Sequence, residues 1–528
     1  MRISTSQYFE TSAANYSKSF SDTAKTQEQI SSGSRIQTAA DDPVGAAKLL
    51  QLQQQSSMLD QYNGNITTVT NSLNQSESVL DSINTALQSA QELAVQAGNG
   101  GLSDDDRTSI ANQLGEIEKN VFALMNSKDT SGNYMFSGSQ TNTPPYVQNS
   151  DGSYAYQGDQ TQLSLQVSDT LSIATNDTGF STFEQAVNTS RTYSSMTAPA
   201  TDDGRVNVSA GNMSSQASYT NAFVSGQPYT LSFVSSTQYK LTDASGNDVT
   251  AETAANGTLD PNNTDGATVT LRGVDFNINV NFKSSDSSVT ADSVIAGHTF
   301  TLGSTPDTIS ANRNPNNTST AQISSASVTS AASYNSTFPA NGAVVKFSGT
   351  SPSSTYAVYA QPYGPDSKAI ATGAVSGSSV TAAGVTFNLS GTPANGDSFT
   401  ISADSHKTQN VLDTIHQLKA ALSTPVTADA GSKLALKNAV SSAINNLKSA
   451  SVTIDTTRGA IGARGNSLDI QSAENSSISL ANKSTQQAIG DTDMATASVT
   501  LSLQQTMLQA SQLAFAKISQ LSLFSKLG

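Results

Sequence analysis

The stretch LQQQSSMLDQYNGNITTVTNSLNQSESVLDSINTALQSAQELAVQA, residues 52–97, places an apolar residue at every seventh position. A second apolar set fills the companion positions of the same repeat. The two sets are Leu52, Leu59, Ile66, Leu73, Leu80, Leu87 and Ala94, and Tyr62, Val69, Ile83, Ala90 and Ala97. Apolar residues with this spacing are typical of a helix that packs along another helix in a coiled coil. The stretch therefore predicts a long helix that needs a helical partner.

The residues on either side of this stretch set the ends of the helix. Asp42 is a favourable N-cap with Pro43 at the first helical position, and the glycine-rich run 98–101 is a strong stop. Ser103 and Asp106 have the spacing of a capping box, which predicts the start of a second helix. The apolar stripe of that helix is Ile110, Leu114, Ile117, Val121 and Leu124.

The C-terminal part of the chain has a similar organisation. A short helix is predicted over 411–422, before Pro425. A longer helix follows, with apolar residues at seven-residue steps: Val440, Leu447, Ile454, Ile461 and Leu468. Because neither end of the chain closes a core alone, we predict that the two ends pack on each other as one antiparallel helical bundle.

Proline separates the middle of the chain from its ends, because 12 of the 14 prolines lie between Pro144 and Pro393. Proline disfavours helix interiors, so the middle is predicted to be mostly non-helical. Residues 134–175 have the pattern of a hairpin joined to the bundle, and short alternating strands follow. The predicted fold class is α+β, with a long antiparallel helical bundle or coiled coil made from both chain ends and an inserted all-β region.

The β-region contains an internal repeat. VTLRGVDFNI at 269–278 aligns without gaps with VTAAGVTFNL at 380–389, and GHTFTL at 297–302 aligns with GDSFTI at 396–401. Chance similarity between β-hairpins is the alternative to duplication. We favour duplication and predict two related β-modules separated by the Ser/Thr/Asn-rich stretch 303–341.

These boundaries divide the chain into four predicted regions. Two are discontinuous, because each combines a segment from either end of the chain. The regions are terminal coiled-coil polymerisation segments at 1–42 and 490–528, a bundle core with a β-hairpin at 43–180 and 405–489, a first outer β-module at 181–310 and a second at 311–404.

The last helix of the chain is apolar on two nearly opposite faces. One face carries Met494, Ala497, Leu501, Leu508 and Phe515, and the other carries Val499, Leu503, Met507, Ala510, Ala514 and Leu521. The N-terminal segment has a stripe of its own, formed by Phe9, Tyr16, Phe20 and Ala24. One apolar face suffices for a contact between two helices, so the second face predicts burial against neighbouring subunits. The alternative is that both ends tuck into the bundle of the same chain.

Composition excludes several classes of function. The 528-residue chain contains no cysteine, so it has neither disulfides nor thiolate chemistry. Its formal charge is -15 and it has no basic run, which disfavours nucleic acid and anionic membrane surfaces as partners. The N-terminus lacks the pattern of a cleavable secretory signal, which leaves the cytosol or another export route.

No catalytic, cofactor-binding or metal-binding residue is predicted, which disfavours an enzyme in the middle of the chain. The three histidines lack metal-ligand spacing and are expected to be surface or packing residues: His298, His406 and His416. Glycines at every third position of 459–465 do not match a nucleotide-binding loop. Small residues for a close helix contact explain them better.

Two motifs at opposite ends of the chain carry a family resemblance. The run QISSGSRIQTAADDPVG at 29–45 closely resembles the N-terminal signature of the flagellin family, and RGAIGARGNSL at 458–468 resembles the C-terminal motif of that family. Arg35, Arg458 and Arg464 lie inside these motifs. We predict that they form salt bridges or hydrogen bonds between subunits, with ordinary surface arginines as the alternative.

The resemblance implies a structural subunit that is exported unfolded through the flagellar type III channel, without a cleavable signal, to the extracellular flagellum. The chain ends and residues 154–159 resemble hook-filament junction subunits more than filament flagellins, which remain the alternative within the family. The implied partners are the hook-side junction protein (the first hook-associated protein), flagellin, further copies of the chain in a ring and a flagellar export chaperone. A surface adhesin or ligand-binding protein that acts through the β-modules is the alternative from another class.

The terminal helices supply most of the residues that we predict at subunit interfaces. They are the apolar residues of the stripes and the three motif arginines: Phe9, Tyr16, Phe20, Arg35, Arg458, Arg464, Leu501, Leu503, Met507, Leu508, Phe515 and Leu521.

Overall fold

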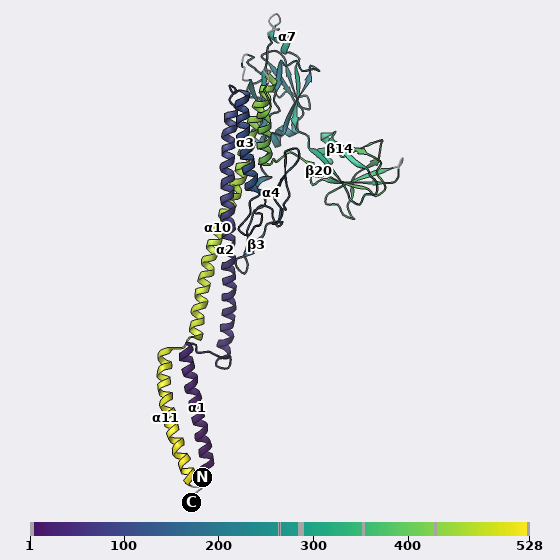
Figure 1. The fold of residues 1–528 in the computed structure, drawn as a ribbon. Helices are drawn as coiled ribbons and strands as arrows, with labels where there is room; N and C mark the ends of the chain where they lie inside the picture. The colour runs from purple at the N-terminus through teal and green to yellow at the C-terminus, as the bar shows by residue number, and fades with distance from the viewer. Residues whose placement is uncertain are drawn as a thin grey trace. The chain divides into compact units, whose positions relative to one another are not determined.

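The computed structural model describes residues 5–261, 263, 266–283, 290–350, 354–426 and 430–524. The chain divides into two compact units. The first consists of Met1–Asn74, Leu163–Thr175 and Ile461–Gly528, and the second of Gln75–Gln162 and Asn176–Ala460. Long helices come from both chain ends and β-structure from the middle (Figure 1), so the predicted α+β fold class is confirmed.

Six long helices account for the ends of the chain. The predicted start at Pro43, the stop before Gly98 and the capping box of Ser103 and Asp106 are all confirmed. The prolines and glycines therefore set the helix ends as their backbone preferences require. The helices are α1 (Thr5–Ser32), α2 (Pro43–Ala97), α3 (Asp104–Met125), α9 (Val411–Ser423), α10 (Ala430–Gly490) and α11 (Met494–Phe524).

Helices α2 and α10 run antiparallel in both units. Asn84 donates to Asp455 at 3.1 Å in the second unit, and Asn475 donates to Asn63 at 3.4 Å in the first. The seven-residue positions of both helices are buried, which confirms the predicted seam. They are Leu52, Leu59, Ile66, Leu73, Leu80, Leu87 and Ala94 on α2, and Val440, Leu447, Ile454, Ile461 and Leu468 on α10.

The region 134–175, which we expected to form one hairpin, forms two. One pairs β1 (Tyr146–Gln148) with β2 (Tyr154–Tyr156) in the second unit. The other pairs β3 (Ser164–Gln166) with β4 (Ser172–Ala174) in the first unit. Both are attached to helices of their own unit. The short helix α4 (Gly179–Phe183) follows.

The first β-module, residues 192–304, consists of two antiparallel sheets around one apolar core. One sheet has the order β5-β12-β8-β9, and in the other β11 pairs with β10, β6 and β7. The strands are β5 (Thr192–Ala198), β6 (Val206–Val208), β7 (Asn212–Met213), β8 (Tyr229–Phe233), β9 (Tyr239–Thr242), β10 (Ala267–Leu271), β11 (Val274–Val280) and β12 (Thr299–Ser304). Its short helices are α5 (Gln216–Ser218), η1 (Tyr219–Phe223), α6 (Val224–Gly226), η2 (Thr250–Glu252) and α7 (Ala291–Ile295).

The second β-module, residues 308–404, has the corresponding two sheets, β13-β20-β15-β16-β17 and β14-β19-β18, around its own core. The strands are β13 (Thr308–Arg313), β14 (Gln322–Val328), β15 (Ala343–Ser348), β16 (Thr355–Ala360), β17 (Ala369–Ala374), β18 (Ser379–Ala382), β19 (Val385–Ser390) and β20 (Ser398–Asp404), with the helix α8 (Ala331–Thr337) between β14 and β15. The stretch 303–341, which we expected to separate the modules, instead contains two strands and a helix of the second one. Serine and threonine fit solvent-facing strand positions, so their abundance was no sign of a linker.

The repeated motif forms the same hairpin in both modules. Arg272 and Gly273 occupy the turn between β10 and β11 with φ of 47° and 82°, and Ala383 and Gly384 occupy the turn between β18 and β19 with φ of 48° and 79°. Two consecutive residues with positive φ form the tight hairpin turn that favours glycine at its second position. Because the strand order also corresponds, the similarity extends over the whole module and supports duplication.

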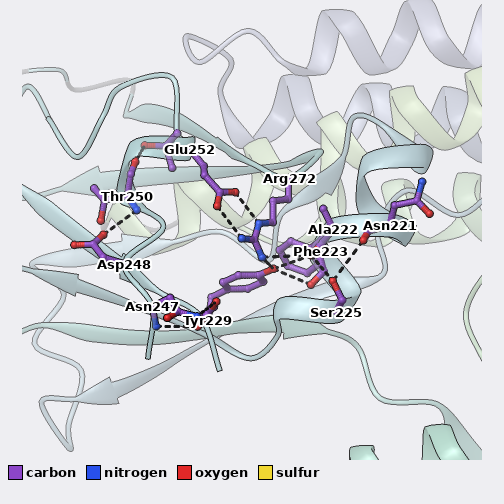
Figure 2. Close-up of polar contacts among 12 residues, drawn as sticks. Asn221, Ala222, Phe223, Ser225, Tyr229, Asn247, Asp248, Thr250, Glu252 and Arg272 are labelled. Atoms are coloured by element: carbon purple, nitrogen blue, oxygen red, sulfur yellow. Dashed lines mark hydrogen bonds and ion pairs between the residues drawn. The ribbon is translucent and has the colours of Figure 1, made fainter. Parts of the chain in front are cut away.

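The turn of the first module carries an arginine whose contacts are shown in Figure 2. The Arg272 guanidinium donates two hydrogen bonds of 2.7 Å to the carboxylate of Glu252 and one of 3.0 Å to the hydroxyl of Tyr229. These contacts raise the pKa of Arg272 above its usual range, and the hydrogen bonds to the Glu252 carboxylate contribute most. Ala383 occupies the same turn position in the second module, so the second turn has no such ion pair.

The first module is fastened to α10 by uncharged polar side chains. Asn446 Oδ1 accepts from the backbone N–H of Thr189 at 2.7 Å and from its hydroxyl at 2.6 Å. Asn212 donates to Asn438 at 3.1 Å and accepts from Ser442 at 2.6 Å. Because Asn438, Ser442 and Asn446 recur every four residues, they lie on one face of α10.

Candidate subunit-interface surface of the terminal helices

Helices α1 and α11 lie side by side in the first unit (Figure 1). The rings of Tyr16 and Phe515 stack with their centroids 6.2 Å apart. Leu501 and Leu508 are half-buried on the same face of α11 as Phe515. One of the two predicted apolar faces of α11 is therefore used to hold the two chain ends together.

The opposite face of α11 is uncovered. Val499 is 72% exposed, and Leu503, Met507 and Leu513 are each more than half exposed. Fully burying one such side chain stabilises a protein by about 1.5–3 kcal/mol, so this face offers a large gain to any partner that covers it. We call Val499, Leu503, Met507, Ala510 and Ala514 the outer strip of α11.

The structure separates the predicted interface residues of the two helices into groups. Tyr16, Leu501, Leu508 and Phe515 are half-buried, whereas Phe20, Leu503 and Met507 are exposed. The side chains of Phe9 and Leu521 lie outside the described part of the chain. Met494 was assigned to the same face as Leu501, but it is 49% exposed.

Two short linkers connect this helix pair to α2 and α10, and they bind each other. The backbone N–H of Arg35 donates to the carbonyl of Gly490 at 2.7 Å, and that of Thr492 donates to Gly33 at 2.9 Å. The Arg35 guanidinium donates to the carbonyl of Ile489 at 2.9 Å. Arg35, which was predicted at a subunit interface, therefore has partners within its own chain.

Aspartates reinforce the linker between α1 and α2. Asp42 accepts from Arg35 at 3.2 Å, and Asp41 pairs with Lys25 at 2.6 Å. The Lys25 ammonium and the backbone N–H of Thr38 hold the pKa of the Asp41 carboxyl below its usual range. The linker therefore keeps its charges paired at neutral pH.

The other two motif arginines also find partners within the chain. Arg458 contacts Glu77 at 2.8 Å, Asp81 at 3.0 Å and Asp455 at 3.4 Å in the second unit. Glu77, the largest influence, and the two aspartates raise the pKa of Arg458. Arg464 donates to the carbonyl of Ala174 at 3.3 Å in the first unit.

Residues 3–141 match the family model described as the bacterial flagellin N-terminal helical region. The N-terminal helical part of the chain is therefore similar to that of bacterial flagellins. The matched region includes α1, α2, α3 and the linker that contains Arg35. It therefore contains α1, the helix that packs against α11.

Individual relatives differ in how much they share with the chain. Flagellar hook-associated protein 3 of Salmonella typhimurium is 37% identical over 183 residues, which are 35% of this chain and 57% of the relative. Flagellin of Listeria monocytogenes is 33% identical over 97 residues, which are 18% of this chain and 34% of the relative. The match to the first of these relatives therefore spans little more than half of its length.

A solved structure resembles the fold of the chain. Flagellar hook associated protein-3 from Legionella pneumophila aligns over 83% of this chain and 98% of its own, with a TM-score of 0.50 and 18% identity. At this identity the likeness concerns the fold.

The structure adds exposed apolar residues that our sequence reasoning missed. Val44 and Leu50 on α2, and Ile470 and Leu480 on α10, are each at least 69% exposed in the first unit. They lie between the seven-residue positions, so the seam pattern drew attention away from them. A search of the sequence for a second apolar stripe, with residues three or four apart, would not have singled out Ile470 and Leu480. Each would have looked like an isolated apolar residue on a helix surface, which is common.

Neither the glycines nor the histidines form a chemical site. A Cβ at Gly459, Gly462 or Gly465 would meet no atom within 4 Å, so the expectation of close packing at these glycines is wrong for this chain by itself. His298 lies 3.1 Å from Asp203, and His416 lies 3.0 Å from Glu118. Among the residues that the structure describes, no group of side chains could hold a metal ion, and no helix is long and apolar enough to cross a membrane.

Proposed function

We propose that the chain is a structural subunit of the bacterial flagellum that joins the hook to the filament and polymerises through its N- and C-terminal helices. The observation that carries the proposal is the outer strip of α11, which remains exposed after α1 has covered the opposite face. A partner that buried this strip would remove several apolar side chains from water. The role is structural and involves no reaction.

The relatives favour a junction subunit over filament flagellin. The hook-associated relative shares a longer stretch with the chain, and at higher identity, than the Listeria flagellin does. The described linkers and helix pair would serve either role. Sequence similarity therefore carries this part of the proposal.

The proposed partners follow from this role. On the side of the cell the subunit would meet the hook-side junction protein, and on the far side flagellin. Further copies of the chain would complete a ring, with a flagellar export chaperone bound before secretion. The proposed location is extracellular, on the flagellum, reached through the flagellar export channel.

Two charges placed on the outer strip test the assembly role. Leu503→Asp combined with Met507→Asp should prevent stable insertion because each carboxylate would have to be buried between subunits. The matched control is Gln505→Asp with Gln509→Asp, because both glutamines are also exposed on α11. Circular dichroism of the purified chains establishes that both variants fold.

The readouts are motility, attached filaments and flagellin in the culture medium. We expect cells with the strip variant to export the chain, lose attached filaments and release flagellin as unassembled monomer. Cells with the control should swim normally. Normal filament attachment in the strip variant would refute the assembly role, whereas loss of flagellin itself on deletion of the gene would identify filament flagellin instead.

A further inference from the structure

The large sheets of the two modules share a register but differ in their outer faces. In the first module one row of paired residues crosses the sheet with hydroxyl groups at every position: Thr242, Thr230, Thr301 and Ser195. In the second module the corresponding row is Tyr359, Val344, Thr400 and Asn312. Because the strand order is the same, the fold does not require the tyrosine and valine at these positions.

The next row shows a second difference. Ser232 of the first module corresponds by its pairing to Lys346 of the second. Lys346 pairs with Ala357 on one side and with Ser398 on the other, and Ala357 pairs with Thr372 at the edge. A cation and three small or hydroxyl side chains therefore lie next to the row of Tyr359.

Tyr363 completes the cluster from the loop that follows β16. Its ring centroid lies 5.0 Å from that of Tyr359, and the two rings are inclined by 59°. The Lys346 ammonium lies 5.2 Å from the Tyr363 ring centroid and donates to the Tyr363 hydroxyl at 3.2 Å. Tyr363 is still 39% exposed, and Tyr359 is half-buried. We call Val344, Lys346, Tyr359 and Tyr363 the tyrosine patch.

We propose that the tyrosine patch binds a short acidic oligosaccharide, one that contains carboxylated sugar rings. Tyrosine rings offer an apolar face with a polar edge, which suits the C–H face of a sugar. The exposed hydroxyls of Thr372, Thr400 and Ser402 provide hydrogen-bond partners around that face. The first module also has a lysine in the row of Ser232, but Lys240 is paired with Asp248 at 3.5 Å, whereas Lys346 contacts Tyr363.

Charge favours an acidic ligand over a neutral one. Over the described part of the chain Lys346 makes no ion pair, so its ammonium is available for a carboxylate. A hydrogen bond between two charged groups is shorter and stronger than one between neutral groups. A chain of net charge -15 would otherwise repel an acidic polymer, which gives this one cation a large share of any attraction.

The size of the patch favours a sugar over a protein. The tyrosine patch lies on two neighbouring strands about 4.8 Å apart, and even with the two flanking strands included the face measures only roughly 14 Å by 7 Å. A stable protein interface buries about 800 Å² on each partner, several times this area. A second copy of the chain is therefore a poorer occupant and becomes an outcome of the test.

The experiment titrates the full chain with tetragalacturonate and with neutral maltotetraose, by calorimetry. We expect tetragalacturonate to bind at least tenfold more tightly than maltotetraose. Tyr363→Ala should weaken its binding at least tenfold, whereas Tyr363→Phe, which keeps the ring, should retain most of it. Lys346→Gln should remove the preference for the acidic sugar together with its salt dependence.

The matched control lies in the other module. Thr242→Ala alters the position that corresponds to Tyr359 and should leave binding unchanged. The melting temperature of each variant shows that the module remains folded. Absence of binding at millimolar tetragalacturonate, or binding that survives Tyr363→Ala, would overturn the proposal. So would self-association of the full chain that Tyr363→Ala abolishes in sedimentation, because the patch would then be a protein interface. Motility plays no part in this readout, so the result is independent of the proposed junction role.

Discussion

The two β-modules keep the same backbone but stabilise it with different polar groups. Both have the same positive-φ turn, and equivalent apolar side chains such as Phe276 and Phe387 fill both cores. The residue before the paired β12 or β20 is His298 in one module and Asp397 in the other, and each is buried. The comparison teaches that backbone geometry and apolar volume persist in a duplicated fold while its polar contacts are replaced.

Attachment to the rest of the chain differs as well. The first module is fastened to α10 through Asn212, and the segment just before the module through Thr189. The second module begins and ends at Thr308 and Asp404, which are paired neighbours on β13 and β20. Thr192 and Ser304, the ends of the first module, are paired in the same way, so both modules have the arrangement of an insertion.

The largest expected effect comes from the equivalent core phenylalanines. Phe276→Ala and Phe387→Ala should each lower the free energy of unfolding of their own module by about 3–5 kcal/mol, because each leaves a cavity among buried side chains. Hydrogen exchange followed by mass spectrometry measures the opening free energy of each module separately. Each substitution should leave the other module unchanged. Destabilisation of both modules by either substitution would mean that they unfold as one unit.

The next largest effect concerns the two polar sites that differ between the modules, Asp397 in the second and the pair of His298 and Asp203 in the first. Asp397 accepts from the backbone N–H groups of Thr318 and Ala394, each at 2.9 Å. Asp397→Asn should destabilise the second module by about 1–3 kcal/mol at pH 7, because one N–H would then face an NH₂ group. Asp203→Asn, which alters the partner of His298, should cost the first module less, because the Asp203 side chain is 31% exposed. Hydrogen exchange at pH 7 compares the two.

Acid should affect both sites in the same direction. Burial raises the pKa of both Asp397 and Asp203, but hydrogen bonds to each carboxylate outweigh burial and hold the pKa below the ordinary value of 3.8. The unfolded chain therefore binds a proton before the folded chain does, and the stabilisation is complete above pH 3.8 and lost as the pH falls below it. Urea titrations between pH 5 and about pH 2 should show that the free energy of unfolding falls with pH. In Asp397→Asn the free energy of unfolding should fall less steeply with pH. An unchanged slope in that variant would contradict the assignment.

Sequence patterns predicted features that local chemistry determines. The seam of α2, the helix start at Pro43 and the two faces of α11 depend on residues close together in the chain, and the structure has all three. The arginine contacts could not be predicted in this way. Arg458 meets Glu77, which is hundreds of residues away, and only the antiparallel pairing of α2 and α10 brings them together.

The candidate assembly surface was predicted in part for the same reason. An apolar stripe shows that a helix face must be covered, but it does not say which face the chain itself covers. The stacking of Tyr16 on Phe515 assigns one face of α11 to the chain and leaves Leu503 and Met507 exposed. The extent of the duplication could not be predicted from the sequence either. The repeated motif, at 269–278 and 380–389, covers only one hairpin of each module.

The smallest expected effect has opposite signs in the two modules. Ala383 and Arg272 both adopt a positive φ, which costs a residue with a Cβ about 1 kcal/mol relative to glycine. Ala383→Gly should therefore stabilise the second module, by about 0.5 kcal/mol once the greater flexibility of unfolded glycine is included. Arg272→Gly gains the same relief but loses the bonds to Glu252 and Tyr229. Since the Glu252 side chain is 44% exposed and water screens the pair, we expect a net loss of only about 1 kcal/mol.

Hydrogen exchange of each module measures this difference, with Arg272→Lys as the control. Lysine keeps the charge and the positive φ but cannot make the paired bonds to Glu252, so it should fall between the native chain and Arg272→Gly. Stabilisation of the first module by Arg272→Gly would contradict the role of the ion pair. It would mean that relief of the turn outweighs the contacts of Arg272, and that the two hairpins differ in sequence but not in what holds them.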